Sequence, residues 1–241
     1  MYHGSHRFKR YHTKRHILAS VIILALPILL LIAIGWFTKA SWQDISSSLG
    51  LSLGRLIASY ILSLVIGAGL ALLIGASRLG ERFLPVFDVL QNVPSFALIP
   101  LFITLFGYTS LMIVLFSATS IVWPIMFYAA SAILGVKQEL SDAAAIFGAT
   151  GWKRIAYFLI PLSFPALVTG SIVGISIGWE AVIGAEIIGN THGIGTLLNG
   201  AGSSGNTALF TTGIVALLTV VFIVNRLVWT PLLAAARNYN E

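Results

Sequence analysis

The sequence predicts an all-α integral membrane protein, a bundle of six transmembrane helices with a polar insert between the fourth and the fifth. Of its 241 residues, 57% are hydrophobic and only 9% are charged, whereas soluble domains carry roughly 25% charged residues. Several apolar runs reach the roughly 20 residues that a helix needs to cross a bilayer. Cysteine is absent, which excludes disulfides and cysteine-ligated metal sites.

Six apolar runs are long enough to span the membrane: residues 17–37, 51–77, 84–106, 110–134, 166–189 and 208–233. Their uniform hydrophobicity favours helices, because barrel strands alternate over about ten residues. Pro94 and Pro100 interrupt the third run, so we expect that segment to be kinked or partly re-entrant. The first run exceeds the roughly 7–15 apolar residues of a signal peptide, so we interpret it as a retained span.

The distribution of lysine and arginine predicts the orientation, because these residues are retained on the cytoplasmic side. With a cytoplasmic amino terminus, twelve of the fourteen basic residues lie inside, and only Lys39 and Arg55 lie toward the other face. Both termini and the insert are therefore expected in the cytoplasm. We divide the chain into a basic tail, residues 1–16, and one transmembrane domain, residues 17–237, with the insert at about 137–165.

The insert is helix-prone and too polar for lipid. Ser141 and Asp142 are expected to cap a helix that begins near Ala143, since a side-chain oxygen and a carboxylate both suit a helix amino terminus. Gly148 and Gly151 should turn the chain. The following stretch "WKRIAYFLI" should form a second short helix that stops before Pro161.

Small side chains in this insert allow another protein to approach closely, and neighbouring apolar side chains offer contacts, so we expect a docking element. The expected docking residues are Asp142, Ala143, Ala144, Ile146, Phe147, Gly148, Gly151, Trp152 and Pro161.

The insert resembles the cytoplasmic signature of the inner-membrane permeases of binding-protein-dependent ABC importers. That signature reads Glu-Ala-Ala, three residues, Gly, nine residues, Ile, one residue, Leu-Pro. Asp142, Ala143, Ala144, Gly148 and Pro161 fall at matching positions. The departures are Asp142 for glutamate, Phe158 for isoleucine and Ile160 for leucine.

The resemblance implies that the insert is a coupling helix that fits a groove in a cytoplasmic ATPase subunit. This chain has no phosphate loop of the form GxxxxGK[ST]. ATP and Mg are therefore expected on the partner, and no cofactor, metal or catalytic residue is expected here. The resemblance further implies an extracytoplasmic solute-binding protein, a homodimer of the permease in the lipid of the inner membrane, and no nucleic-acid partner.

Two longer stretches, "PVFDVLQNVPSFALIPLFITLFG" and "PLSFPALVTGSIVGISIGWEAVIGAEIIGNTHGIGTLL", are similar to the nitrate, sulfonate, taurine and bicarbonate branch of this family. The resemblance implies a small oxyanion as the transported solute. A permease for a thiamin-precursor-like heterocycle is the alternative. A stand-alone channel or secondary transporter would leave the insert unexplained, and a membrane-embedded enzyme would need a catalytic set that we do not find.

Glu180 and Glu186 lie inside the fifth run, and carboxylates within the membrane indicate a functional site or a partner. Six residues apart on a helix, they project about 120° from each other. Arg55 is the expected partner of Glu186. With Trp179, these three residues are candidates for the solute pathway or gate, and a structural role as paired or capping groups is the other interpretation.

Two further features of the sequence are expected to serve packing and docking. The glycines of spans two and five recur on one helix face, which indicates close helix packing. The uncharged segment of residues 190–207 is expected to be an external loop, either flexible or a docking surface for a binding protein.

Overall fold

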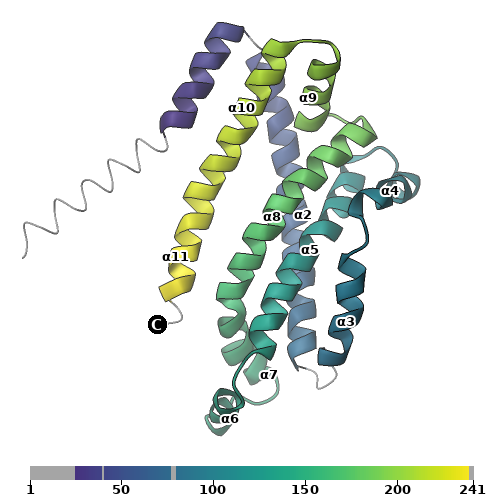
Figure 1. The fold of residues 1–241 in the computed structure, drawn as a ribbon. Helices are drawn as coiled ribbons and strands as arrows, with labels where there is room; N and C mark the ends of the chain where they lie inside the picture. The colour runs from purple at the N-terminus through teal and green to yellow at the C-terminus, as the bar shows by residue number, and fades with distance from the viewer. Residues whose placement is uncertain (1–24, 40, 77–79, 239–241) are drawn as a thin grey trace, which may run out of the picture.

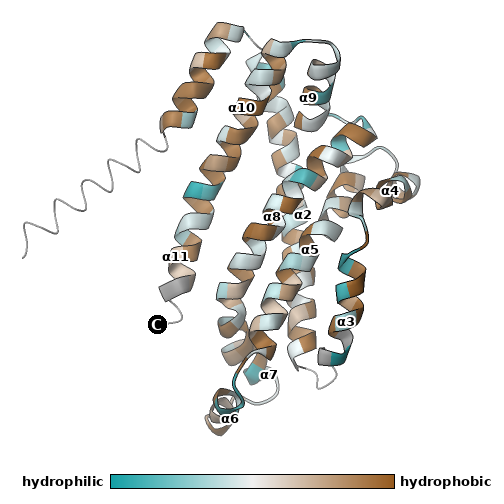
Figure 2. Cartoon of the chain, viewed as in Figure 1, coloured by the Kyte–Doolittle hydropathy of each residue, from teal (hydrophilic) through white to brown (hydrophobic). Residues whose placement is uncertain are grey.

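The described residues of the computed structural model, 25–39, 41–76 and 80–238, contain only helices as regular elements. Most of the helices run side by side in an elongated bundle (Figure 1). Figure 2 shows hydrophobic residues along the length of these helices. The elements are α2 (Trp42–Ala76), α3 (Gly80–Gln91), η1 (Ser95–Leu98), α4 (Ile99–Phe106), α5 (Ser110–Leu134), α6 (Gln138–Ile146), α7 (Trp152–Arg154), η2 (Ile155–Leu159), α8 (Ile160–Gly189), α9 (Ile194–Ser203), α10 (Thr207–Val224), η3 (Asn225–Trp229) and α11 (Thr230–Asn238).

Helices α2, α5 and α8 make the most extensive contacts and form the core. Glycines permit their close approach: a Cβ on Gly170 of α8 would lie 2.9 Å from the carbonyl oxygen of Pro124 on α5. On α2, Gly67 faces Val122 and Ile125 of α5 in the same way. The interpretation of these glycines as packing residues is therefore confirmed.

Serines add hydrogen bonds between α2 and α5. The hydroxyls of Ser59 and Ser63 lie 3.1 and 3.0 Å from the carbonyl oxygens of Val114 and Ala118 on α5. Each shares its single proton between that carbonyl and one a turn earlier on α2, at 2.8 and 2.7 Å. Because lipid offers no alternative partner to a backbone carbonyl or a hydroxyl, such bonds hold two membrane helices together. The hydrophobic core around them includes Phe116 of α5.

Four helices are long and apolar enough to cross a membrane: Trp42–Gly75, Ser110–Leu134, Trp152–Gly189 and Thr207–Ala236. The expected break in the third span is confirmed, because Leu84–Gln91 and Ser95–Phe106 meet at 79°. Counted as one span, this pair makes five. The first predicted span is described only as the apolar helix Ala25–Thr38, since residues 17–24 and the basic tail lie outside the described residues.

The second span begins earlier than its apolar run predicts. Helix α2 starts at Trp42, nine residues before residue 51. Asp44 in its first turn suits the positive end of the helix dipole, and the Ser41 hydroxyl accepts the Asp44 amide at 3.4 Å. These polar residues extend the helix beyond its hydrophobic part.

The predicted loop of residues 190–207 is wrong in part, because it contains the helix α9. The prediction that the helix stops before Pro161 is also wrong. The chain is helical from Trp152 to Gly189, and Pro161 lies directly after a π-helical turn, a local widening that accommodates a residue without an amide donor inside a helix. The π-helical turn η2 precedes it and joins α7 to α8 without a break.

Candidate functional site

Two structurally different regions lie at opposite ends of the bundle (Figure 1). Helices α6 and α7 of the insert project at one end, and α9 packs at the other. The insert carries the expected docking residues. The end with α9 carries Arg55 and Glu186.

The insert consists of α6, a turn and α7. Gly148 and Gly151 in the turn have φ angles of +86° and +52°, a conformation that side-chain-bearing residues rarely adopt. The predicted turn is therefore confirmed. Around it, Ile146, Phe147 and Trp152 are 84%, 91% and 72% exposed, so three large apolar side chains have little cover within the described chain.

Ser141 and Asp142 do not cap a helix as predicted. Helix α6 begins four residues earlier, at Gln138, after the extended residue Lys137. Asp142 lies inside the helix, where its Oδ1 accepts the Gln138 amide nitrogen Nε2 at 2.9 Å. Glu139 occupies the first turn instead and provides the negative charge that the helix dipole favours.

The expected ion pair between Arg55 and Glu186 is present at the other end. Nη1 of Arg55 lies 2.6 Å from Oε1 of Glu186, and the Glu186 side chain is fully buried. The hydroxyl of Ser52 lies 2.7 and 2.9 Å from the two carboxylate oxygens, and the amide of Gly195 donates to Oε2 at 2.9 Å. Both oxygens of this carboxylate therefore have partners within the chain.

The remaining donors of Arg55 bind other segments. Nη1 also donates to the carbonyl of His192, while Nε and Nη2 lie 3.2 and 2.9 Å from the hydroxyl of Ser110. The amide of Ile194 donates to the Ser52 hydroxyl at 2.9 Å. We call this set of contacts the Glu186 network, and it joins α2, α5, α8 and the segment that leads into α9.

The Gly-Ile-Gly turn of this segment is shaped by the carboxylate. Gly193 has φ +154°, and a Cβ there would lie 2.2 Å from Cδ of Glu186. A Cβ on Gly195 would lie 2.5 Å from the carbonyl oxygen of Ile183. Only glycine allows the backbone to reach the carboxylate so closely, and these contacts favour the structural interpretation of Arg55 and Glu186.

Sequence reasoning missed Ser52, Ser59, Ser63 and Ser110, which take part in the Glu186 network or bind across the helix interface. The first three are buried and lie with Arg55 at spacings of three or four residues along α2. That spacing places them on one helix face. This line of polar residues along an apolar helix could therefore have predicted that these serines make contacts inside the bundle.

Glu180 and Trp179 lie elsewhere on α8. Glu180 is exposed and makes no hydrogen bond or ion pair with the described residues. Trp179 is only 7% exposed and belongs to the hydrophobic core. The four candidate pathway residues are thus not a single cluster, and the pathway role remains a prediction for each of them.

No group of three or more His, Cys, Asp or Glu side chains that could hold a metal occurs within residues 25–39, 41–76 and 80–238. The histidines of the amino-terminal tail lie outside this part of the chain.

Comparison with known proteins identifies the family. The family described as binding-protein-dependent transport system inner membrane component matches residues 63–228, more than half of the chain. The chain belongs to this family. It is a multi-pass membrane protein of the ABC permease type.

Its relatives lie in the branch that the sequence resembles. The taurine transport system permease protein of Escherichia coli (strain K12) is 25% identical over 78% of this chain and 68% of its own. The nitrate import permease protein of Leptolyngbya laminosa is 29% identical over 77% and 70%. The bicarbonate transport system permease protein of Synechococcus elongatus (strain ATCC 33912 / PCC 7942 / FACHB-805) is 25% identical over 61% and 51%.

We predict that Glu186→Ala lowers the free energy of unfolding by about 3–5 kcal/mol, because Arg55 then remains as a buried charge without its partner. Chemical denaturation of the purified chain in detergent measures the loss. Glu180→Ala on the same helix is the control. It should change stability by less than about 0.5 kcal/mol, as exposed substitutions do, and equal losses in the two variants would contradict the role of the network.

Proposed function

We propose that this chain is the translocation subunit of an ATP-driven importer and that a cytoplasmic ATPase binds its insert. The observation that carries the proposal is the exposure of Ile146, Phe147 and Trp152 at one end of a membrane protein. Exposed large apolar side chains outside the bilayer mark a protein interface. The signature positions Asp142, Ala143, Ala144 and Gly148 lie between or beside them.

The chain itself contains no phosphate loop, and in this proposal the energy for uphill transport comes from a partner with bound ATP and Mg. An extracytoplasmic binding protein would deliver the solute to the opposite end, where α9 lies. Movement of the ATPase would act on the insert, and the continuous helix Trp152–Gly189 would carry that movement through the membrane to the Glu186 network.

The solute in this proposal is a small oxyanion. The support comes from the relatives, which are named for taurine, nitrate and bicarbonate. All three solutes carry an anionic oxygen-bearing group. A heterocycle resembling a thiamin precursor stays the alternative, since the free carboxylate of Glu180 would suit a cationic or hydrogen-bond-donating solute.

The exposed position of Glu180 supports the proposal that two copies of the chain assemble. A carboxylate in a membrane-spanning helix faces a protein interior or a water-filled cavity, because lipid does not solvate it. Glu180 is exposed and unpaired in the described single chain. A homodimer that encloses an aqueous path next to this face of α8 would provide the required surroundings.

The proposed topology has six spans, with both termini and the insert in the cytoplasm. Lys137, Lys153 and Arg154 flank or lie in the insert, as expected for the cytoplasmic side. Lys39 follows the apolar helix Ala25–Thr38 at the end where α9 lies.

We predict that Gly148→Phe leaves membrane insertion intact but lowers ATPase copurification and solute uptake at least about tenfold. A side chain at φ +86° strains the turn and displaces the docking residues on both sides of it. Pull-down of the ATPase and uptake into proteoliposomes measure the effect. Gly107→Phe is the matched control, since Gly107 also has a positive φ, +66°, and open space around it, but lies between α4 and α5, outside both the insert and residues 190–207. Equal losses would contradict the coupling role.

Because the chain has no cysteine, the topology can be tested with single cysteines in an otherwise unchanged protein. A membrane-impermeant maleimide applied to intact spheroplasts should label Ser203→Cys on α9 and not Ser141→Cys on α6. Inside-out vesicles should reverse the pattern. Labelling of both positions from the same side would refute the proposed topology.

A further inference from the structure

A small cavity lies between the middle of α8 and the π-helical turn η3. Its volume is about 200 Å³, and its polar lining residues are Ser176, Trp179, Asn225 and Trp229. The lining residues of α8 lie between positions 172 and 179, at least ten residues from either end of that helix. The cavity therefore lies near the middle of the α8 span, and Ser176 and Asn225 at its edge are exposed in the single chain.

Trp229 is a buried donor without an acceptor. Its side chain is 7% exposed, and its Nε1–H is buried with no hydrogen-bond partner in the described chain. The ring is held in place by the edge-on contact of Tyr60 at 5.9 Å and 85°, and the Tyr60 hydroxyl in turn lies 3.1 Å from the hydroxyl of Ser171. Buried polar groups are rarely left unpaired, so this fixed indole indicates a missing acceptor.

The other polar side chains that line the cavity also carry hydrogen-bond donors. The side chains of Trp179 and Asn225 make no hydrogen bond with the described residues, whereas the Ser176 hydroxyl donates to the carbonyl of Ile172 at 3.0 Å. Asn225 and Trp229 begin and end a π-helical turn, a conformation that is frequent at functional sites. Indole and amide N–H groups that lack partners therefore gather around one cavity.

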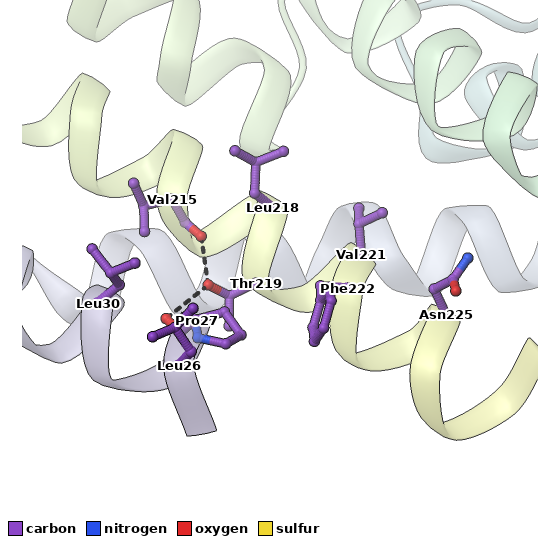
Figure 3. A pocket seen from close by; sticks show the side chains of 9 residues that line it. All are labelled: Leu26, Pro27, Leu30, Val215, Leu218, Thr219, Val221, Phe222 and Asn225. Carbon is purple, nitrogen blue, oxygen red and sulfur yellow. Dashed lines mark hydrogen bonds between the residues drawn. The ribbon is translucent and has the colours of Figure 1, made fainter. Parts of the chain in front are cut away.

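The larger groove shown in Figure 3 differs in chemistry. It lies between the helix Ala25–Thr38 and α10, has a volume of about 700 Å³ and is lined almost wholly by apolar side chains. Its Thr219 hydroxyl already donates to the carbonyl of Val215 at 2.7 Å, and the carbonyl of Pro27 lies 3.4 Å away. Asn225 lines both spaces, but two unpaired indoles line only the smaller one.

We infer that the small cavity binds an oxyanion within the membrane and that the indole N–H of Trp229 donates to it. The site offers neutral donors, and no charged side chain lines it. Neutral dipoles replace the hydration of an anion without the strong attraction of a lysine or arginine, so the anion can also leave, as conduction requires. The volume lies below the roughly 300–1,000 Å³ of sites for drug-sized ligands, which suits a solute of few atoms.

The identity of the solute rests on the proposed function, but binding can be tested without transport. The full-length chain is purified in lipid nanodiscs with ¹⁵N-labelled tryptophan, and the six indole N–H resonances are followed by NMR while sodium nitrate or taurine is added. Trp229→Phe keeps the aromatic ring, removes the N–H and assigns its resonance. Trp36→Phe, in the helix Ala25–Thr38 and 83% exposed, is the matched control.

The Trp229 resonance should shift and saturate with at least one of these solutes and not with sodium chloride. Trp229→Phe should weaken binding at least about tenfold by equilibrium dialysis, since hydrogen bonds to charged groups are the strong ones. Asn225→Leu is a second variant and should weaken binding without loss of the Trp229 resonance. A Trp229 resonance that does not move, or unchanged binding in Trp229→Phe, overturns the inference.

Uptake by the assembled transporter separates this inference from the proposed function. If Trp36→Phe and the unmodified chain transport the solute and Trp229→Phe transports it equally well, the cavity is not on the route, and the permease function stands. If no variant transports any oxyanion, the proposed function fails, and the NMR titration alone decides whether the cavity binds one.

Discussion

The buried pair of Arg55 and Glu186 is the interaction on which the arrangement of the α9 end depends. A carboxylate without solvent is stable only when its charge and its hydrogen-bonding capacity are both met. Here a guanidinium, a hydroxyl and a backbone amide meet them. Each of these donors comes from a fixed place in the chain, so the pair also determines where the segment before α9 runs and how it reaches α2 and α8.

The two ends of the bundle differ in their chemistry. At the α9 end, Arg55, Glu186 and Ser52 are buried and bonded to one another within the chain. At the insert, large apolar side chains are exposed and the turn depends on two glycines with positive φ. The first arrangement is complete in the single chain, whereas the second gains stability only when another surface covers it. Because of this difference, we assign a structural role to the α9 end and propose that the insert docks a partner.

Hydropathy predicted most of the membrane helices, because lipid requires a long apolar surface and satisfied backbone groups in every span. The Arg55–Glu186 pair was predictable since few charges occur at membrane depth. Helix ends were less predictable: polar residues extend α2 back to Trp42, and Pro161 is accommodated in the first turn of α8 after a π-helical turn. The cavity beside Trp229 was not foreseen, because a π-helical turn and an unpaired indole depend on how α8 and η3 pack.

The most direct test of this account is amide hydrogen exchange of the purified chain, followed by mass spectrometry of peptides that cover residues 190–196 and 147–152. The amides of Ile194 and Gly195 donate to Ser52 and Glu186 inside the network, so the first peptide should exchange as slowly as the core of α8 although it joins two helices. The second peptide, an exposed turn, should exchange rapidly. Equally rapid exchange of both peptides would contradict the claim that the buried pair holds the α9 end in place.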